Sequence, residues 1–249
     1  MNTVLQEILR TRRVRRPKES DSVPLTSAVA SEEGELLQRL VRGVDATVTL
    51  EVGLAYGVSA LYICDALQVR EDTRHYVIDP NQRRSVCGEC WDGVGIGNLE
   101  RAGFAGIVRL IEKPSHLALP ELEAAGVQVD FAFIDGWHTF DFTLVDFFYV
   151  DHLLRVGGIV VFDDCNWPAI RKACRFVATN RAYSAVDAIV PPPSRKRRVA
   201  EWVLAKTPLG RLLRLEERRS DAQLGIHGSC VAFRKDRRDD RPFSHFAEF

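Results

Sequence analysis

The stretch LEVGLAYGVSALYI, residues 50–63, decides the fold of this chain. A buried-strand pattern ends near Glu51, the chain passes through Gly53 and Gly57, and an apolar run at helical spacing follows. Glycines at such a turn let the backbone approach a bound molecule, and the free amides of a helix N-terminus favour carboxylate or phosphate groups. The stretch therefore predicts a strand, a ligand-binding turn and a helix. An ordinary strand-to-helix turn without a ligand is the alternative.

Short apolar runs recur along the chain, and each is nearly continuous in apolar character, as in strands buried on both faces. These strand candidates are 47–52, 75–79, 107–111, 129–135, 158–164, 183–190 and 229–234. Helical candidates between them are 58–68, 95–102, 116–125, 140–154 and 168–178. The alternation predicts an open, doubly wound α/β fold that binds ligands at the carboxyl ends of parallel strands.

Composition excludes several classes of protein. The chain has 249 residues, 46% of them hydrophobic, which is enough for one large domain. Its 34 basic and 34 acidic residues cancel, so the net charge provides no attraction to nucleic acid or to a membrane. No apolar run approaches the roughly 20 residues that span a bilayer. The six cysteines are scattered through apolar segments, which indicates a reducing compartment. We therefore expect a cytoplasmic protein without a membrane partner.

Two regions fall outside the regular alternation. Residues 1–30 are expected to form a basic N-terminal arm in solvent, with an organelle presequence as the alternative. The domain itself is expected over 31–249, beginning with an amphipathic helix at Ser31. An insertion at about 191–225 opens with three prolines and a basic run. A lid over the substrate, a dimer contact and a surface loop are all open interpretations of it.

Acidic residues follow several of the predicted strands. Asp79 ends the second strand, where an acidic side chain can bind ribose hydroxyls. Asp135 in FIDGWHTF and the pair Asp163 and Asp164 in VVFDDCNW end two later strands. Adjacent parallel strands bring their carboxyl ends together, and carboxylates are ligands that Mg²⁺ prefers. The sequence predicts a divalent-metal site, with helix N-capping by the aspartate pair as the alternative.

His138 lies three residues after Asp135, so one loop can hold both a metal ligand and a general base. An imidazole is suited to take a hydroxyl proton near neutral pH. A purely structural histidine is the alternative. The segment CGEC, residues 87–90, has the spacing of metal ligands, but a single pair without nearby histidines does not predict zinc.

The quoted segments, together with VIDP and FIDGWHTFDFTLVDFFYVDHLLRVGGIVVFDD, resemble a known family over roughly residues 25–180. They are similar to class I S-adenosylmethionine-dependent methyltransferases, in particular the metal-dependent catechol-type O-methyltransferases and the related branch that modifies macrolide sugars. The resemblance implies a Rossmann-like, doubly wound α/β fold with a seven-stranded, mostly parallel sheet and an antiparallel last strand. It also implies that 31–249 is a methyltransferase domain.

The resemblance implies roles for particular residues. The methionine part of S-adenosyl-L-methionine would lie against Glu51, Gly53, Tyr56, Gly57 and Ser59. The rest of the cofactor would contact Asp79 at the ribose and Ser115 at the adenine, with Asp135 nearby. The ligand set for Mg²⁺ would be Asp135, Asp163 and Asp164, and the catalytic pair would be His138 and Asp135. The pair Asp163-Asp164 replaces the Asp-Asn of catechol enzymes and resembles the sugar-modifying branch.

The expected reaction is metal-assisted O-methylation of a small-molecule hydroxyl by in-line displacement. A metal-independent N- or C-methyltransferase is the first alternative. A nucleic-acid-binding protein that uses the basic runs at 10–18 and 195–198 is the second, and we do not expect it because such runs are usually solvated. The sequence leaves the acceptor and a homo-oligomeric state open.

Overall fold

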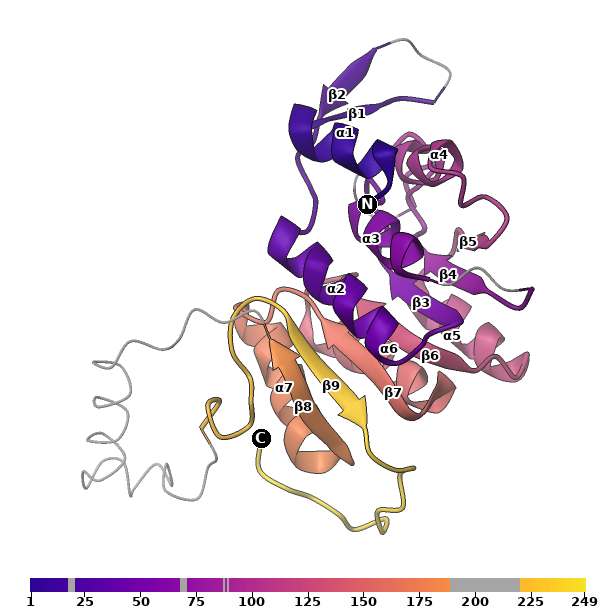
Figure 1. Ribbon diagram of the computed structural model, residues 1–249. Coiled ribbons are helices and arrows are strands. Elements are labelled where there is room, and N and C mark those ends of the chain that lie inside the picture. The colour runs from indigo at the N-terminus through magenta and orange to yellow at the C-terminus, as the bar shows by residue number, and fades with distance from the viewer. Residues whose placement is uncertain (18–20, 68–70, 87, 89, 189–219) are drawn as a thin grey trace, which may run out of the picture.

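A seven-stranded sheet forms the centre of the computed structural model, which describes residues 1–17, 21–67, 71–86, 88, 90–188 and 220–249. The strands of the sheet are β3 (Val48–Val52), β4 (Arg74–Ile78), β5 (Val108–Ile111), β6 (Val129–Ile134), β7 (Leu154–Phe162), β8 (Tyr183–Ala188) and β9 (Val231–Lys235). Their order is β5-β4-β3-β6-β7-β9-β8 (Figure 1). The first five strands in this order, from β5 through β4, β3 and β6 to β7, pair in parallel. Strand β9 is antiparallel to β7 and β8. The predicted sheet, with its antiparallel last strand, is confirmed.

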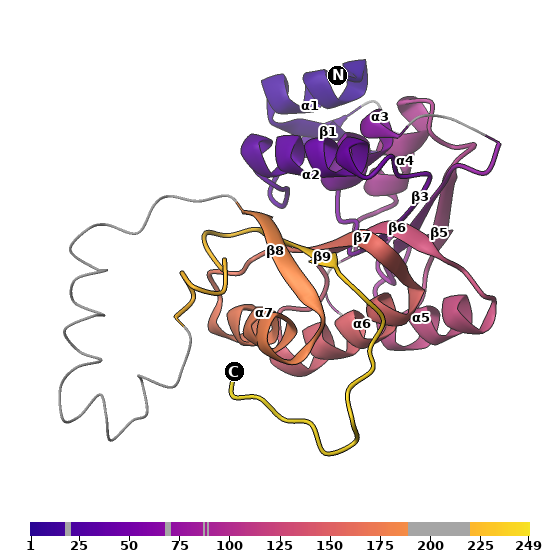
Figure 2. The ribbon, with the colours of Figure 1, turned by 60° about the horizontal axis from the view of Figure 1, so that its bottom comes forward.

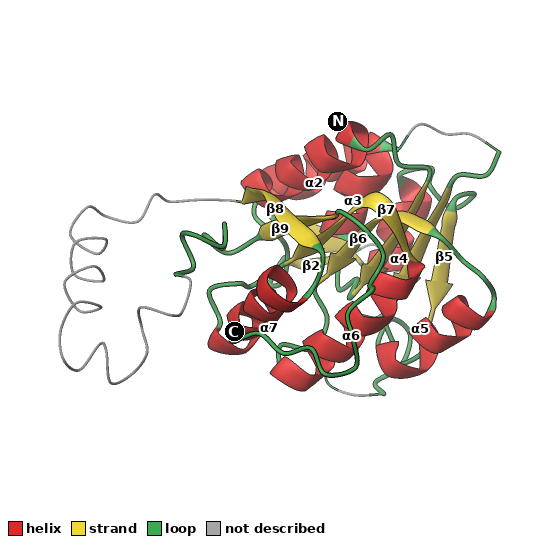
Figure 3. Ribbon diagram, turned by 90° about the horizontal axis from the view of Figure 1, so that it is seen from below, coloured by secondary structure: helices red, strands yellow, loops and turns green. Residues whose placement is uncertain are grey.

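Helices cover both faces of this sheet, as Figures 2 and 3 show. One layer holds α1 (Thr3–Thr11), α2 (Ser31–Gly43), α3 (Val58–Ala66) and α4 (Val94–Arg101). The other holds α5 (Ser115–Ala124), α6 (Phe140–Leu153) and α7 (Pro168–Asn180). Successive side chains of a strand point to opposite faces, so in β6 Phe133 packs toward the first layer and Ala132 toward the second. Burial on both faces explains the continuous apolar runs of the sequence.

The element boundaries follow local signals in the sequence. Helix α3 begins after Gly57, which has a φ of +77° and acts as the N-cap. Helix α7 begins with Pro168, whose fixed φ suits the first helical position. Strand β7 begins at Leu154, four residues earlier than predicted, because Leu154 pairs with Val129 across an irregularity in the register.

The expectation of a solvated N-terminal arm is wrong for the described residues. Helix α1 buries Val4, Leu5 and Ile8 in the core, and β1 (Arg13–Arg15) forms an antiparallel hairpin with β2 (Ser22–Pro24) (Figure 1). The segment packs against the core because α1 carries an apolar stripe, although basic residues surround it in the sequence. A helix with such a stripe is stabilised by packing rather than by solvent.

Most of the predicted insertion lies outside the described residues. From its end, Leu224 is buried with the core beneath α7, and the chain then enters β9. Within the described part of the chain, no helix is long and apolar enough to cross a membrane.

Candidate functional site

The loop after β3 lies directly against the end of β6. The backbone amide of Asp135 donates a 2.9 Å hydrogen bond to the carbonyl oxygen of Val52. Gly53 has a φ of +91°, and a Cβ at this position would lie 2.0 Å from the carbonyl oxygen of Asp135. Both the backbone conformation and the available space therefore require glycine. This close approach sets the first wall of a cavity.

A cavity of about 190 Å³ opens at the carboxyl ends of β3, β6 and β7. One side is formed by the loop after β3 and the first turn of α3, and the other by the segments that follow β6 and β7. Its lining comprises Ser27, Ala28, Val29, Glu33, Leu54, Ala55, Val58, Ser59, Asp135, His138, Asp163 and Asp164. Five predicted site residues thus meet in one place, namely Ser59, Asp135, His138, Asp163 and Asp164.

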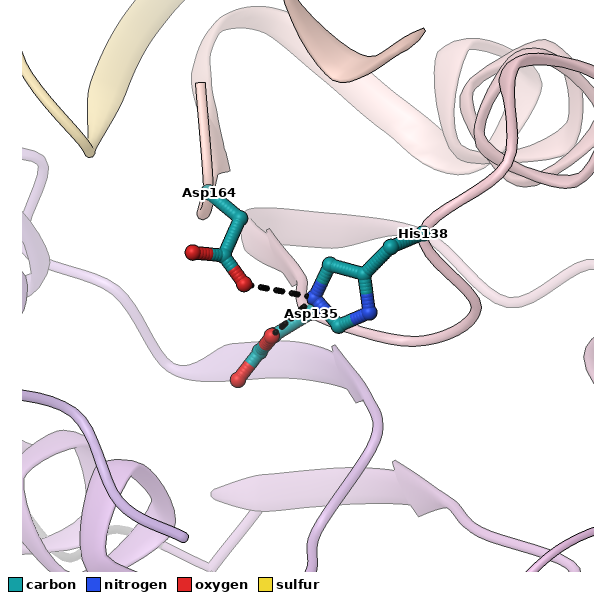
Figure 4. A group of neighbouring side chains, drawn as sticks. All are labelled: Asp135, His138 and Asp164. Atoms are coloured by element: carbon teal, nitrogen blue, oxygen red, sulfur yellow. Dashed lines mark ion pairs between the residues drawn. The ribbon is translucent and has the colours of Figure 1, made fainter. Parts of the chain in front are cut away.

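Two carboxylates and an imidazole converge on one side of this cavity (Figure 4). The Nε2 atom of His138 lies 2.7 Å from Oδ2 of Asp164 and 3.5 Å from Oδ1 of Asp135. One ligand atom from each of the three residues lies within 4.8 Å of the others, a spacing that can hold a metal ion. We call Asp135, His138 and Asp164 the convergent group. It includes His138, which the sequence suggested as a base. Asp163 lines the same cavity but is not part of this group, and its Oδ1 accepts a 2.7 Å hydrogen bond from the backbone amide of Asp164.

The carboxyl groups of this cluster perturb one another. Removal from solvent, reinforced by the charge of Asp135, raises the pKa of Asp163 to about 9. Desolvation also raises the pKa of Asp135 to about 6, against the opposing effect of the neighbouring His138 imidazole. The proximity of Asp135 is in turn the largest cause of a raised pKa at His138. The cluster is short of positive charge, which suits a cation.

The alternative of helix capping does not account for the aspartate pair. Helix α7 begins at Pro168 after Trp167 and has no side-chain cap hydrogen bond. Asp164 adopts a φ of +51°, in the left-handed region that few residues other than glycine occupy. Non-glycine residues held in this region often belong to functional sites. The conformation turns the Asp164 carboxylate toward His138.

Asp79 is buried and shapes the loop after β3. Its Oδ2 accepts hydrogen bonds from the backbone amides of Leu54 and Ala55, at 3.2 and 3.0 Å, and from the side-chain amide of Gln82. Its Oδ1 accepts from the backbone amide of Asn81. The carboxylate thus lies where the sequence indicated, beside the glycine loop. Its ribose-binding role stays a prediction.

Besides Gly53 and Asp79, four further predicted cofactor residues are absent from the lining of the cavity. Gly57 approaches α4 so closely that a Cβ would lie 2.9 Å from the carbonyl oxygen of Gly95. The hydroxyl of Tyr56 lies 3.3 Å from Oγ1 of Thr26. Ser115 begins α5 and hydrogen-bonds Asp146, whose pKa is raised to about 6 by burial. The fourth, Glu51, is fully buried in β3 below the loop.

Sequence reasoning missed two residues at the site. Glu33 of α2 lines the cavity and accepts hydrogen bonds from the backbone amide of Ala30 and the hydroxyl of Ser229. Its only local signal is its place in the first turn of a helix, where an acidic residue ordinarily favours the helix dipole. Trp167 is 53% exposed, and its ring centroid lies 5.6 Å from that of His138. An aromatic residue three positions after a metal-type aspartate could have indicated it.

The comparison with protein families agrees with this geometry, since residues 50–165 match the family described as "Methyltransferase domain". These residues, just under half of the chain, are similar to a methyltransferase domain. The match begins at β3 and ends just after Asp164, so it contains the glycine loop and the convergent group. The predicted resemblance is confirmed.

Known methyltransferases share this domain and its fold. A protein of Arabidopsis thaliana assigned as a caffeoyl-CoA O-methyltransferase is 31% identical over 140 residues, which are 56% of this chain and 55% of that protein. The chain therefore spans about half the length of the curated relatives it matches. Cofactor-bound Rv0187 from MTB aligns over 95% of this chain and 91% of its own, with a TM-score of 0.62 at 16% identity. An O-methyltransferase from Bacillus cereus in complex with SAH aligns over 94% and 92%, with a TM-score of 0.55 at 18% identity. These structures share the fold of this chain, which confirms the predicted architecture.

Proposed function

We propose that this chain uses S-adenosylmethionine to methylate a hydroxyl group of a small molecule, with the help of a divalent cation. The observation that carries the proposal is the cavity in which Ser59 faces the convergent group of Asp135, His138 and Asp164. One wall offers the glycine loop and helix N-terminus that suit a cofactor with a carboxylate. The opposite wall offers the groups that suit a hydroxyl and its proton.

The cofactor supplies a methyl group on a positively charged sulfonium, ready for displacement. On this proposal Gly53 and Ser59 lie against its methionine part, and Asp79 lies toward its ribose. The tight contact of Gly53 with Asp135 supports this placement, because it keeps the loop clear of side chains where the cofactor would pass. The negative cavity wall would also attract the sulfonium charge.

A divalent cation bound by the carboxylates of Asp135 and Asp164, beside His138, would lower the pKa of a bound hydroxyl. Asp135 and Asp164 fit such an ion, because one carboxylate oxygen of each lies within 4.8 Å of the other and of a ring nitrogen of His138. Carboxylates favour Mg²⁺ or Mn²⁺, whereas an imidazole favours softer ions. We propose Mg²⁺ or Mn²⁺, with the Asp163 ligand of the sequence prediction still to be tested.

His138 is proposed to take the acceptor proton. Its ring lies on the cavity wall next to both carboxylates, which orient it and stabilise its protonated form. Trp167 lies beside the same ring and exposes an aromatic face. A planar acceptor would gain stacking contact there while its hydroxyl reaches His138. The caffeoyl group in the names of the relatives is such a planar ring, with adjacent hydroxyls.

Calorimetric titration with S-adenosylhomocysteine, with and without Mg²⁺, tests the cofactor site. Turnover of a panel of catechols, monophenols and sugar hydroxyls, each in Mg²⁺ and in EDTA, then tests the reaction. We expect S-adenosylhomocysteine to bind both with and without Mg²⁺. We expect catechols to be methylated in Mg²⁺ but not in EDTA. If the protein does not bind S-adenosylhomocysteine in either condition, the proposed use of S-adenosylmethionine is wrong.

One observation favours a metal-independent methyltransferase as the second candidate. His138 already places an imidazole between Asp135 and Asp164, so the histidine itself could neutralise the carboxylates. Such an enzyme would methylate nitrogen or carbon, and its turnover would survive EDTA. Nucleic-acid binding gains no support from the run at 10–18, where Arg13, Arg15 and Arg16 contact Ser22, Glu7 and Asp92. The basic run at 195–198 lies outside the described residues.

The cellular setting is likewise a proposal. Cys64, Cys165, Cys174 and Cys230 are buried free thiols, as expected in a reducing compartment such as the cytoplasm. Fractionation of cells that express the tagged protein would test this location. Size-exclusion chromatography would test whether the chain forms a homo-oligomer.

A further inference from the structure

Three polar side chains occupy the core directly below the glycine loop. Thr49 and Glu51 belong to β3 and His75 belongs to the adjacent β4, and none of the three is exposed to solvent. Thr49 is paired with His75 in the parallel register, and Glu51 is two residues further along β3. Residues two apart on a strand share a face of the sheet, so the three side chains lie on one face.

The three side chains form a chain of contacts. Oγ1 of Thr49 lies 2.9 Å from Nδ1 of His75, and Nε2 of His75 lies 3.4 Å from Oε2 of Glu51. When the Thr49 hydroxyl donates to Nδ1, the proton of the neutral ring is on Nε2 and faces the carboxylate. In that arrangement Thr49 holds the ring in place with its Nε2 proton directed at Glu51.

Glu51 nevertheless lacks the donors that a buried carboxylate needs. Among the described residues neither of its oxygens accepts a hydrogen bond, and Nε2 of His75 likewise has none. An unsatisfied carboxylate in the core is costly, and such groups in native proteins ordinarily have a functional partner. In the part of the chain that the structure describes, Nε2 of His75 faces Glu51 at 3.4 Å from Oε2 without forming a hydrogen bond. A bound ligand with hydrogen-bond donors would satisfy this carboxylate.

The position of Glu51 indicates where that partner is bound. Glu51 lies two residues before Gly53, where the loop turns toward the cavity. Its charge also contributes to the raised pKa of Asp135 on the cavity wall. The proposed cofactor carries an ammonium group on its methionine part, which provides both positive charge and three hydrogen-bond donors.

We propose that His75, anchored by Thr49, is a positioning residue that holds the Glu51 carboxylate for the ammonium group of the cofactor. The inference rests on the proposed function and extends it to a residue that touches neither the cavity nor the acceptor. Mutating a residue that hydrogen-bonds a metal ligand commonly lowers metal affinity by about 10–100-fold. We expect a loss of cofactor affinity in the lower part of that range here. Because the contact is specific for the amino-acid part, the nucleoside part should be bound as before.

Two ligands separate this role from a general structural one. S-adenosylhomocysteine has the ammonium group, whereas 5′-methylthioadenosine has the same nucleoside thioether without the amino-acid part. In calorimetry, His75→Leu should weaken S-adenosylhomocysteine about tenfold and leave 5′-methylthioadenosine within about twofold. His75→Gln, whose side-chain amide can donate in place of Nε2, should restore most of the affinity. Thr49→Val, which removes only the anchoring hydroxyl, should lie between the two and serves if His75→Leu does not fold.

Val77→Ala is the matched control, since Val77 is a buried residue of β4 paired with Glu51. It should lower thermal stability without changing the ratio of the two affinities. Equal weakening of both ligands in His75→Leu and Thr49→Val would overturn the positioning role. Wild-type protein that binds 5′-methylthioadenosine but not S-adenosylhomocysteine would also overturn it. Wild-type protein that binds neither would instead remove the proposed function on which the inference rests.

Discussion

His138 and Asp164, which follow different strands of the sheet, bring Nε2 and Oδ2 to within 2.7 Å of each other. The contact exists because β6 and β7 pair in parallel, so the segments that follow them meet at one edge. Asp135 adds a second carboxylate to the same imidazole at 3.5 Å. This arrangement makes the role of each side chain testable.

His138→Ala separates a general base from a metal ligand. If His138 takes the acceptor proton, kcat should fall by about 10²–10⁴-fold while Mn²⁺ affinity changes little. Raising the pH should partly restore the rate, because more of the acceptor is then already ionised. Mn²⁺ titration followed by electron paramagnetic resonance measures the affinity. A parallel loss of Mn²⁺ binding would identify His138 as a ligand instead.

Asp164→Asn tests the metal site itself. Loss of one charged ligand should weaken Mn²⁺ binding at least about tenfold and reduce turnover, while S-adenosylhomocysteine binding survives. The matched control is Asp141→Asn on the exposed surface of α6, which should leave both affinities unchanged. Unaltered turnover of the Asp164 variant in EDTA would exclude a metal role and favour the metal-independent candidate.

Gly53→Ala should disturb the cavity more than the same change elsewhere. The added Cβ would lie 2.0 Å from the Asp135 carbonyl oxygen, in addition to the unfavourable φ of +91°. Gly103→Ala is the control, because Gly103 has a φ of +86° and no atom within 4 Å of an added Cβ. Urea unfolding should show a loss of about 1 kcal/mol for the control and at least about 2 kcal/mol more for Gly53→Ala. Equal losses would mean that the close approach is unimportant.

The raised pKa of Asp163 predicts a pH-dependent stability. A carboxyl whose pKa is about 9 in the fold and near 4 in the unfolded chain is neutral in the fold over the intervening pH range. The fold then binds the extra proton, so the stability that this group contributes is complete below about pH 4 and is lost as pH rises toward about 9.

In EDTA, the thermal midpoint should therefore fall by at least about 5 °C between about pH 6 and pH 9. Asp163→Asn should flatten this dependence, since an amide keeps the acceptor for the Asp164 backbone amide but cannot ionise. Asp72→Asn, at an exposed position, should leave the slope unchanged. A wild-type midpoint that is constant across this range would contradict the raised pKa. Saturating Mg²⁺ should also reduce the slope if the cation compensates the charge.

Much of the fold could be predicted from local patterns. Continuous apolar runs predicted β3 to β7, because both faces of these strands are buried and their side chains are therefore mostly apolar. The glycines at 53 and 57 indicated the loop, since only glycine fits a positive φ with a neighbouring carbonyl at contact distance. The N-terminal helix was missed because its apolar stripe is short and flanked by basic residues.

The sequence alone determined that Asp79, Asp135, Asp163 and Asp164 would follow strands and meet at one edge, because parallel pairing places every carboxyl end there. It could not determine which atoms would touch. Only the tertiary structure turned Asp164 toward His138, directed Asp163 to a backbone amide, and placed His75 beside Glu51. Those contacts depend on loop conformation and on register between strands distant in sequence, which no local spacing encodes.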